Sequence, residues 1–588
     1  MNFGLFPDQA GGWQARVWAP NASKVAVKSA MLSAPVKLAA VGEGFWEGPV
    51  SGLGAGDPYE LQLTRGDGHL LTRLDPAARD TTNSSLDNWN NTSLLVRPID
   101  PQEPWKPFTT PKFDDLILYQ CHVGSFAGYR DGLVAPGQVA SFNLLKTKLQ
   151  YIRDLGFNAL ALLPVQEFRG GRSWGYNPSF YFALESDYGS PADLRALVNA
   201  CHEIGLAVIF DVVYNHISDE DSSFYHFDER ADGNGDSYLG SYRTPWGWVP
   251  AFWQQGIREF FRANIAMYLA EYLGDGLRFD STRQMEAARG LRNDGWEFMQ
   301  FLTWEAKMLF PGKYLIAEHI PDHDSIVNSA GFHATWASEP FHWIVSALNG
   351  TDPVSNIERA MNNNWGRGQS YAYSWNTIKY LLGSHDECGD ENNGNDGKRY
   401  FVERFGGRGN WYARAKARMA WALNVAAVGT PMIFMGNECH LDGYWHDGWD
   451  THGDHRFDWS IAGDWKGMEM RYLVEAANQA RWNHVALRNG SFEVTHRDLN
   501  GVIAFKRWNN TGDVVLVVVN ASDRSYNGAS YGVVTGQTGQ WDQILCTQDA
   551  WFGGWDGAGN AYYQPYTQND GKVYVNVPQW SVTMFRLL

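Results

Sequence analysis

Alternating hydrophobic and polar positions characterise the first part of the chain, up to about residue 110. The runs at 13–20, 24–30 and 59–64 are separated by Gly, Pro, Asn and Asp and show no helical period. This pattern predicts β-strands, and we expect a small β-sandwich over residues 1–110. The four prolines within residues 100–115 predict a linker after it.

From about residue 116 the hydrophobic pattern changes. Short apolar runs without alternation are typical of a parallel sheet that is buried on both faces. Helical periods at 142–156, 191–205 and 257–274 fall between such runs. Eight runs with intervening helices predict a (β/α)₈ barrel over residues 111–485. The predicted barrel strands are 117–121, 158–163, 207–213, 276–280, 314–318, 332–336, 380–384 and 432–436.

Two further regions complete the predicted organisation. Residues 217–252, after the third run, are rich in Asp, Gly, Ser and aromatic residues, and we expect a short excursion over the barrel mouth. Past residue 485 the β pattern returns, which predicts a C-terminal β-sandwich over 486–588. The predicted fold class is therefore α/β, a TIM barrel flanked by N-terminal and C-terminal β-sandwich domains. The C-terminal strands are expected at 501–508, 513–520, 572–577 and 582–588.

Carboxylates follow four of the predicted barrel strands. The segments DVVYNH, GLRFD, YLIAEH and LLGSHDE supply Asp211, Asp280, Glu318 and Asp386 at or just beyond the end of an apolar run. In a (β/α)₈ barrel these ends form one face, so the four side chains would converge on one pocket. One Asp after a strand is usually a helix cap. Four of them, each with a His or Arg close by, favour a catalytic site instead.

This inventory fits cleavage of a glycosidic bond through a covalent intermediate. Retaining hydrolysis needs a carboxylate nucleophile about 5–5.5 Å from a carboxylic acid. Arg278, two residues before Asp280, points to the same side of a strand and would lower the pKa of that carboxyl. We therefore expect Asp280 to be the nucleophile. Glu318 has no Arg beside it in the sequence, so a raised pKa would suit it as the proton donor.

The remaining polar groups of the four segments would hold the sugar. We expect Asp386 to stabilise the oxocarbenium-like transition state and to bind sugar hydroxyls. His216 and His385 would donate hydrogen bonds to the same sugar. The chain also contains 27 tryptophans in 588 residues. Most tryptophans are core residues, but such a surplus favours carbohydrate, since flat rings suit the apolar faces of sugars.

Composition narrows the range of partners. The formal net charge is −17 and there is no basic tract, which argues against nucleic acid or an anionic membrane. No apolar run approaches the ~18 residues that span a bilayer, and the N-terminus shows no secretory signal pattern. The five cysteines form no CxxC pair, so we expect neither disulfides nor zinc. A cytoplasmic monomer that binds a neutral substrate fits these features.

No cofactor is predicted, because two carboxylates suffice for the chemistry. Calcium is the one metal to weigh, since the loop after the third strand is acidic. We interpret its carboxylates as solvated loop acids and predict no metal site. The residues concerned are Asp219, Glu220, Asp221 and Asp236.

The four segments resemble, in order, the four signature segments of the α-amylase family, glycoside hydrolase family 13. The resemblance covers essentially the whole chain, and four ordered motifs make it specific. WGYNP at 174–178 is similar to the segment whose tyrosine stacks under the scissile sugar, here Tyr176. The region around WAPNA at 18–22 looks like a family 48 carbohydrate-binding module. The resemblance implies Asp280 as nucleophile, Glu318 as acid/base and Asp386 as transition-state stabiliser, supported by Asp211, His216, Arg278 and His385.

Further segments look most like the glycogen-branching members of this family. They are CHVGSF, LLPVQEF, SHDE, PMIFMGNE and RFDW. This resemblance implies cleavage of an α-1,4 bond and transfer of the chain to a 6-hydroxyl of another glucan. Residues 281–283 and His319 depart from the usual pattern beside the catalytic residues, which puts the choice of acceptor in doubt.

Two alternatives stay open. A hydrolase, either an α-amylase or a trehalohydrolase acting on maltooligosyl trehalose, would carry the same motifs. A non-catalytic glycan-binding relative should lack one or more of the three catalytic carboxylates, and all three are present.

Overall fold

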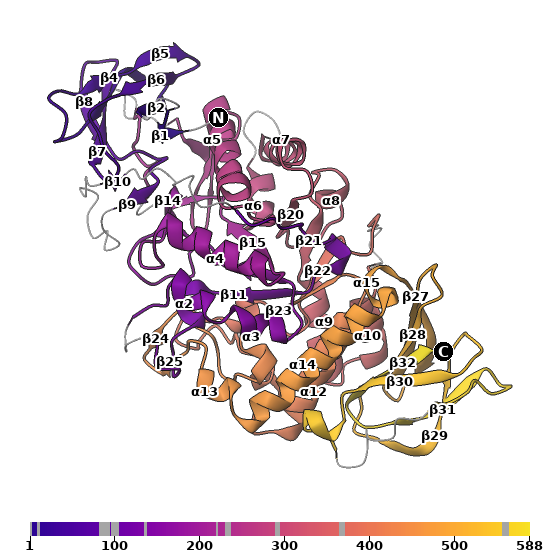
Figure 1. Cartoon of the computed structure of the whole chain (residues 1–588). Helices are drawn as coiled ribbons and strands as arrows, with labels where there is room; N and C mark the ends of the chain where they lie inside the picture. The colour runs from indigo at the N-terminus through magenta and orange to yellow at the C-terminus, as the bar shows by residue number, and fades with distance from the viewer. Residues whose placement is uncertain are drawn as a thin grey trace.

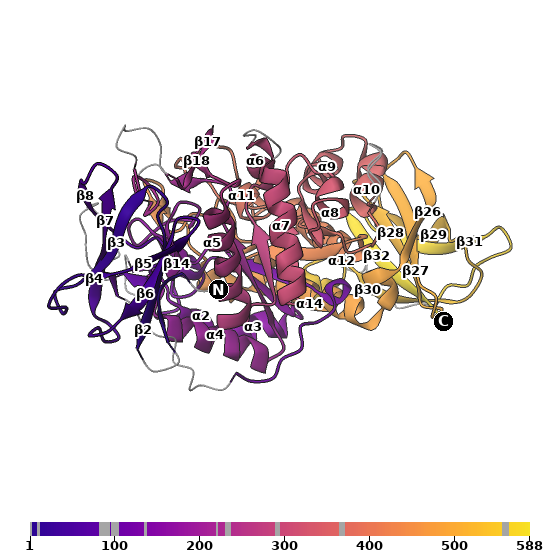
Figure 2. The ribbon, with the colours of Figure 1, turned by 90° about the horizontal axis from the view of Figure 1, so that it is seen from above.

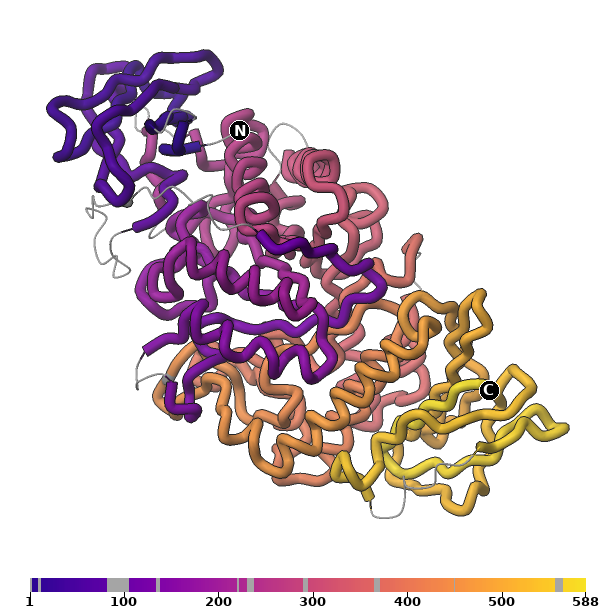
Figure 3. Tube along the Cα trace, viewed as in Figure 1, coloured from indigo at the N-terminus to yellow at the C-terminus, as the bar shows by residue number. Residues whose placement is uncertain are grey.

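A computed structural model gives the arrangement of the chain. It describes residues 3–8, 12–81, 94–95, 105–133, 138–218, 222–229, 237–288, 294–363, 371–555 and 564–588. A β-rich N-terminal region and a β-rich C-terminal region lie at opposite ends of a central barrel (Figure 1). The view from above keeps the same order (Figure 2). In the tube of Figure 3 the indigo N-terminal region lies at one end of the molecule and the yellow C-terminal region at the other.

The N-terminal strands form two antiparallel sheets, as the alternating pattern predicts. One sheet has the order β1-β2-β6-β5, and the other has the order β4-β3-β7-β10-β9 with β8 paired to β7. Alternate residues of β2, such as Trp13, Ala15 and Val17, are buried. The strands are β1 (Gly4–Pro7), β2 (Trp13–Trp18), β3 (Ala22–Lys28), β4 (Val36–Lys37), β5 (Ala39–Gly42), β6 (Phe45–Val50), β7 (Pro58–Arg65), β8 (Leu70–Arg73), β9 (Asp80–Thr81) and β10 (Leu94–Leu95).

Eight parallel strands close into a barrel in the middle of the molecule. Their order follows the sequence, and the last strand pairs with the first. The prediction of a TIM barrel is therefore confirmed, including its sixth and eighth strands. The barrel strands are β11 (Leu118–Cys121), β12 (Ala159–Leu162), β15 (Ala207–Val212), β19 (Gly276–Phe279), β20 (Tyr314–Ala317), β21 (Ala334–Ala337), β22 (Thr377–Lys379) and β23 (Thr430–Phe434).

The seventh strand was predicted in the wrong place. It covers Thr377–Lys379, whereas the apolar run at 380–384 forms the buried turn that follows, with Gly383 at a φ of 90°. Lys379 interrupts the apolar pattern, so a search for apolar runs does not find this strand. Its side chain is fully buried, and its Nζ donates to the carbonyl oxygens of Ala360 and Asn362, each at 2.8 Å.

Helices cover the outside of the barrel. The predicted helix at 142–156 is broken into two short ones, and the one at 257–274 ends in a π-helical segment, η2 (Met267–Glu271). The helix predicted at 191–205 is α4, which begins at a capping box between Ser190 and Asp193. The helices are α1 (Val123–Phe126), α2 (Phe142–Lys146), α3 (Leu149–Asp154), α4 (Pro191–Glu203), α5 (Gln255–Ala266), α6 (Thr282–Ala287), α7 (Asp294–Leu309), α8 (Ser325–Asn328), α9 (Glu339–Leu348), α10 (Pro353–Met361), α11 (His385–Cys388), α12 (Trp411–Ala426), α13 (Trp459–Ala462), α14 (Trp465–Asn483) and α15 (Val485–Asn489).

Short elements extend from the barrel between its strands and helices. The region predicted as an excursion, 217–252, contains a small sheet of the order β16-β18-β17 in its described part. The strands outside the barrel are β13 (Gln166–Phe168), β14 (Pro178–Leu184), β16 (Ile217–Ser218), β17 (Leu239–Thr244), β18 (Gly247–Pro250), β24 (Trp449–Asp450) and β25 (Gly453–Asp454). The 3-10 turns are η1 (Phe113–Asp115), η3 (Glu403–Phe405), η4 (Asn437–Cys439) and η5 (Ala550–Phe552).

The C-terminal region is antiparallel β-structure, and all four predicted strands are present. A five-stranded sheet has the order β26-β27-β28-β32-β30, and β29 pairs with β31 in a second, two-stranded sheet. The middle strand β28 is buried at every residue and supplies much of the core of this region. The strands are β26 (Ser491–Asp498), β27 (Val502–Trp508), β28 (Val514–Asn520), β29 (Tyr526–Val534), β30 (Trp541–Cys546), β31 (Lys572–Val577) and β32 (Ser581–Leu587). The domain boundaries at about 110 and 485 stay predictions.

Candidate active site

The carboxyl ends of three neighbouring barrel strands carry the first group of predicted residues. Asp211 on β15 is in register with Arg278 on β19. Asp280 and Glu318 follow the ends of β19 and β20, and their backbone N–H groups still donate to the preceding strands at 3.0 Å. The parallel register therefore brings Arg278 and three of the four predicted carboxylates together at one end of the barrel.

Arg278 contacts the carboxylates of Asp211, Asp280 and Glu318. Its Nη1 donates to Asp211 Oδ2 at 2.9 Å and to Asp280 Oδ1 at 2.9 Å. Its Nη2 forms an ion pair with Glu318 Oε2 at 2.8 Å. No arginine is next to Glu318 in the sequence, but Arg278 reaches it across the sheet. The guanidinium is buried near the rings of Tyr176 and Trp336, whose centroids lie 5.8 and 5.2 Å from its carbon.

Burial raises the pKa of two carboxyl groups beside Arg278, those of Asp280 and Asp211. It raises the pKa of Asp280 well above its usual range, and the charge of Glu318 adds to the increase. Burial also raises the pKa of Asp211 to about 7. The expectation that Arg278 leaves Asp280 with a lowered pKa is wrong for the substrate-free site, because desolvation outweighs the arginine. Asn215 opposes the increase, since its Nδ2 donates to Asp280 Oδ2 at 2.6 Å.

The backbone after Asp280 holds Glu318. Ser281 has a left-handed conformation, with φ 38° and ψ 53°, and its N–H donates to Glu318 Oε2 at 2.8 Å. The N–H and the hydroxyl of Thr282 both donate to the Glu318 carbonyl oxygen, at 2.8 and 2.6 Å. Within the described residues no hydrogen bond reaches Glu318 Oε1. One oxygen of this carboxyl group is thus fixed and the other is available.

His385 belongs to a chain of hydrogen bonds that ends at Asp211. Gln120 Nε2 lies 2.9 Å from His385 Nδ1, His385 Nε2 lies 2.7 Å from the Tyr176 hydroxyl, and that hydroxyl donates to Asp211 Oδ2 at 2.9 Å. Because the amide of Gln120 donates, the proton of the imidazole is on Nε2. Burial lowers the pKa of His385 well below its usual range, with Arg278 adding to the decrease, so the ring is neutral.

Asp386 lies at the rim of this group. It belongs to the first turn of the short helix α11, where Ser384 Oγ accepts a hydrogen bond from the Asp386 N–H at 3.2 Å. Its side chain is 41% exposed, and Oδ1 lies 3.6 Å from His385 Nε2. The backbone thus fixes the position of Asp386 while its carboxylate faces solvent.

His216 was expected to donate a hydrogen bond to the sugar, and this role stays a prediction. It is buried, with 1% of its surface exposed. Its Nδ1 lies 2.6 Å from Asn215 Oδ1 and its Nε2 lies 3.1 Å from Asn177 Oδ1. His216 therefore orients Asn215, which in turn contacts Asp280.

Several site residues were missed by the sequence reasoning. Asn215 lies inside the segment DVVYNH, and Gln120 lies at the end of the first strand, so position at a strand end was the available signal. Trp246, in the turn between β17 and β18, is 48% exposed, and its ring centroid lies 5.6 Å from that of His216. An exposed indole beside the site offers a stacking surface for a sugar.

The residues that depart from the usual pattern have structural partners. His319 is buried; its Nδ1 lies 3.0 Å from Thr282 Oγ1, and burial lowers its pKa to about 4. Arg283 forms an ion pair with Glu286 within the helix α6. Among the described residues, neither Arg283 nor His319 forms a hydrogen bond or ion pair with a side chain of the three catalytic carboxylates.

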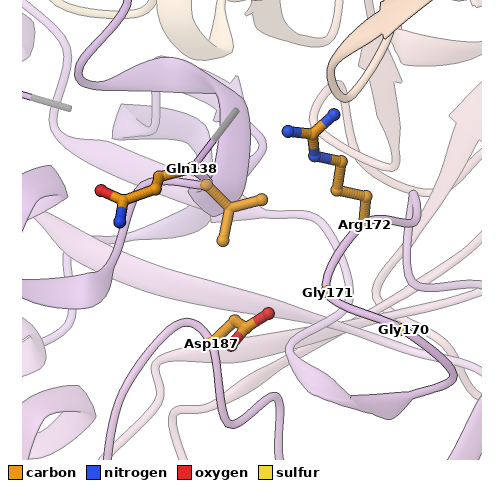
Figure 4. Close-up of a pocket in the computed structure, with 6 residues that line it drawn as sticks. Gln138, Gly170, Gly171, Arg172 and Asp187 are labelled. Atoms are coloured by element: carbon orange, nitrogen blue, oxygen red, sulfur yellow. The ribbon is translucent and has the colours of Figure 1, made fainter. Parts of the chain in front are cut away.

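A polar cavity of about 680 Å³ opens beside the hairpin β13–β14. Figure 4 shows Arg172 and Asp187 at its edge with Gln138 opposite. Asp187 packs against Gly171, where a Cβ would come 2.0 Å from Asp187 Oδ2. The described residues that line this cavity include none of the three catalytic carboxylates.

The metal prediction concerns mainly the acidic loop after β15. The four loop acids that we interpret as solvated lie outside the described residues. In the described ranges, no cluster of three or more His, Cys, Asp or Glu is arranged to hold a metal ion. Of the helices in those ranges, none combines the length and apolar character needed to cross a bilayer.

Three parts of the chain match known protein families. Residues 139–264 match the alpha amylase catalytic domain, and residues 493–587 match the alpha amylase C-terminal all-beta domain. Residues 2–78 match carbohydrate-binding module 48, the isoamylase N-terminal domain. The chain therefore contains the catalytic domain of the α-amylase family, glycoside hydrolase family 13, between an N-terminal and a C-terminal β domain that also match known families. These matches support an enzyme that acts on α-glucans.

The chain is also similar to individual proteins along most of its length. The chain is 27% identical to the 1,4-alpha-glucan branching enzyme GlgB of Pseudomonas putida, over 92% of this chain and 76% of that protein. It is 26% identical to GlgB of Marinobacter nauticus, over 98% and 94%. Among solved structures, an Anoxybacillus pullulanase complexed with maltotriose matches with a TM-score of 0.78, at 17% identity, over 100% of this chain and 86% of that one. At this identity the structural match shows the fold alone.

Proposed function

We propose that the protein is a 1,4-α-glucan branching enzyme of glycogen biosynthesis. The observation that carries the proposal is the likeness to curated branching enzymes along almost the whole chain, together with an intact catalytic group. The relatives are 26–28% identical over 92–98% of the chain. The segments PMIFMGNE and RFDW support the same interpretation.

The first half of the proposed reaction breaks an α-1,4 bond. Asp280 attacks the anomeric carbon of the glucosyl unit while Glu318 gives its proton to the departing 4-oxygen. Both oxygens of Asp280 are already held, by Arg278 and Asn215, whereas Glu318 Oε1 is available to carry the proton. One guanidinium contacts both carboxylates, which supports the short separation of about 5–5.5 Å that a retaining pair needs.

The second half transfers the chain. Glu318, now ionised, removes the proton from a glucan 6-hydroxyl, whose oxygen bonds to the anomeric carbon and releases Asp280. Asp386 stabilises the oxocarbenium-like charge in both steps, and its exposed carboxylate can approach the sugar ring. Tyr176 stacks beneath the reacting sugar, and Asp211 and His385 hold the tyrosine hydroxyl in position.

One assay separates branching from hydrolysis. The enzyme is incubated with amylose while iodine staining and reducing ends are followed together. We expect the stain to fall with nearly constant reducing ends, since each cleaved bond is replaced by a new glycosidic bond. Digestion of the product with a debranching enzyme should then release short linear chains.

A matched rise in reducing ends would overturn the proposal in favour of an α-amylase or trehalohydrolase. The pullulanase among the fold neighbours makes α-1,6 hydrolysis a further outcome to measure, with pullulan as the substrate. The Asp280→Asn variant is the negative control with each substrate. We further propose a cytoplasmic monomer that needs no metal for activity, which EDTA treatment and sedimentation would check.

A further inference from the structure

A group of exposed aromatic rings lies far from the catalytic carboxylates in the sequence, where the barrel meets the C-terminal region. We call it the aromatic platform. It comprises rings from the N-terminal halves of α12 and α14 and from the turn at η5. Its members and their exposed fractions are Trp551 (74%), Trp465 (60%), Trp555 (54%), Tyr412 (47%) and Tyr472 (39%).

The platform is a built surface whose rings have fixed positions. Trp465 and Tyr472 are seven residues apart, so they lie on one face of α14. The ring of Trp551 lies 6.3 Å from that of Tyr472. Gly553, with φ 72°, allows this turn to approach the helix, since a Cβ would come 2.2 Å from Glu469 Oε2.

The other end of the platform is fixed by Trp411. Its Nε1 donates to the Gly553 carbonyl oxygen at 3.0 Å, and its ring lies 5.6 Å from that of Trp555. This hydrogen bond attaches the turn to α12, while the close approach at Gly553 attaches it to α14. Trp551 and Trp555 are therefore carried by a turn that is anchored to both helices.

Charged groups lie between the rings. The guanidinium of Arg414 is 5.5 Å from the ring of Trp465, and Lys466 Nζ is 5.2 Å from it. Such a surface offers flat apolar faces with hydrogen-bonding groups at their edges. A sugar ring has the same character, apolar in the middle and polar at the rim.

The position of the platform relates it to the active site. In a (β/α)₈ barrel the helix that follows a strand begins at the catalytic face. Trp411 and Tyr412 begin α12, which follows β22, and Trp465 begins α14, which follows β23. The first turns of α12 and α14 thus lie toward the same face as Asp280 and Glu318. Figure 1 shows α12 and α14 on the side of the barrel that adjoins the C-terminal strands.

We propose that the aromatic platform is a second binding site for α-glucan chains, separate from the catalytic cleft. The inference rests on the proposed action on α-glucans, whether that action is branching or hydrolysis. A long chain held at the platform would raise the local concentration of glucan at the cleft. The platform would not raise the local concentration of short maltooligosaccharides, because they cannot reach both sites.

Electrophoresis in gels that contain amylose or glycogen tests binding directly. The parent for this test is the Asp280→Asn protein, which does not consume the ligand. We expect Trp465→Ala/Trp551→Ala on this background to raise the dissociation constant for amylose about tenfold. Trp304 is the matched control, because it is also 60% exposed but lies on α7. Trp304→Ala should migrate like the parent.

Kinetics of the active enzyme provide the second readout. The double variant should raise KM for amylose and leave kcat and the turnover of maltohexaose unchanged. Retardation equal to that of the parent would overturn the proposal, whatever reaction the enzyme catalyses. A dimer in sedimentation that the double variant abolishes, without a change in retardation, would assign the platform to a second copy of the chain and would also overturn it. If the double variant misfolds, Trp551→Ala alone, which removes the most exposed ring, provides the same test.

Discussion

Asp280 and Glu318 are held very differently from Asp386. The first two lie at the ends of adjacent strands, share Arg278 and accept hydrogen bonds from Asn215 and from a backbone N–H. Asp386 lies in a short helix at the rim of the site, and its side chain is 41% exposed. Two of the three carboxylates are therefore fixed before substrate arrives, whereas the third faces the space that the substrate would fill.

This difference suits the tasks proposed for the three groups. A nucleophile and an acid must be positioned to a fraction of an ångström relative to the bond that breaks. A group that stabilises charge on the sugar can settle when the sugar binds. Loss of the contacts that fix the first pair should therefore affect both folding and activity, and loss of Asp386 should affect activity alone.

The largest expected effect comes from Asp280→Asn. The amide is nearly isosteric but cannot form the covalent intermediate, so kcat should fall about 10⁴-fold or more. Release of maltooligosaccharide or loss of iodine stain measures this, with circular dichroism to confirm folding. Undiminished turnover would refute the assignment of the nucleophile.

Arg278→Lys tests how the fixed pair is held. An ammonium group cannot contact Asp211, Asp280 and Glu318 together, so buried negative charge loses part of its compensation. We expect kcat/KM to fall about 10³-fold and the Tm to fall by several degrees. Arg283→Lys is the control, since that arginine is half-exposed and pairs with Glu286. Equal Tm values for the two variants would contradict the special role of Arg278.

Asp386→Asn tests the carboxylate that is exposed rather than fixed by an arginine. We expect kcat/KM to fall about 10²-fold, because an oriented negative charge is lost from the transition state. The Tm should remain that of the parent, since the side chain is partly exposed and forms no ion pair with an arginine of the described residues. A marked drop in Tm would show that Asp386 belongs with the fixed carboxylates.

The smallest effect on activity is expected at Asp322, which extends the comparison to a fixed carboxylate outside the catalytic group. It is buried and accepts from the N–H groups of Ser338 and Glu339 at 3.1 and 3.2 Å. Burial raises its pKa from 3.8 to about 8. Between these values the folded protein keeps a proton that the unfolded chain has released, so the free energy of unfolding falls as pH rises.

The Asp322→Asn variant removes the titration and still accepts both N–H groups. Its stability relative to the parent should therefore improve with rising pH, by about 4 kcal/mol between pH ~5 and pH ~9. Thermal unfolding of both proteins at the two pH values measures the change. A Tm difference that does not vary with pH would contradict the buried, protonated state of Asp322.

Most of the architecture could be predicted from hydrophobic periodicity. Seven of the eight barrel strands are marked by apolar runs, because both faces of such a strand are buried. The seventh in chain order could not be found in this way, since it contains Lys379, whose charge is satisfied by carbonyl oxygens of Ala360 and Asn362. Only the folded structure supplies those partners.

The candidate site was predictable in its residues but less so in its electrostatics. Position after a strand identifies Asp211, Asp280, Glu318 and Asp386. It does not show that Arg278 also reaches Glu318, because that contact crosses from β19 to the end of β20. The pKa of Asp280 likewise depends on burial by the whole fold, which a local motif cannot report.

The left-handed backbone at Ser281 has a consequence for how the enzyme can evolve or be redesigned. Residues 281 and 282 donate three hydrogen bonds to Glu318, so the segment beside the proposed nucleophile also positions the proposed acid. Substitutions there alter two functions at once, which makes the segment a poor place to change acceptor preference. New specificities are easier to reach through loops such as the turn that carries Trp246, whose ring is exposed beside His216.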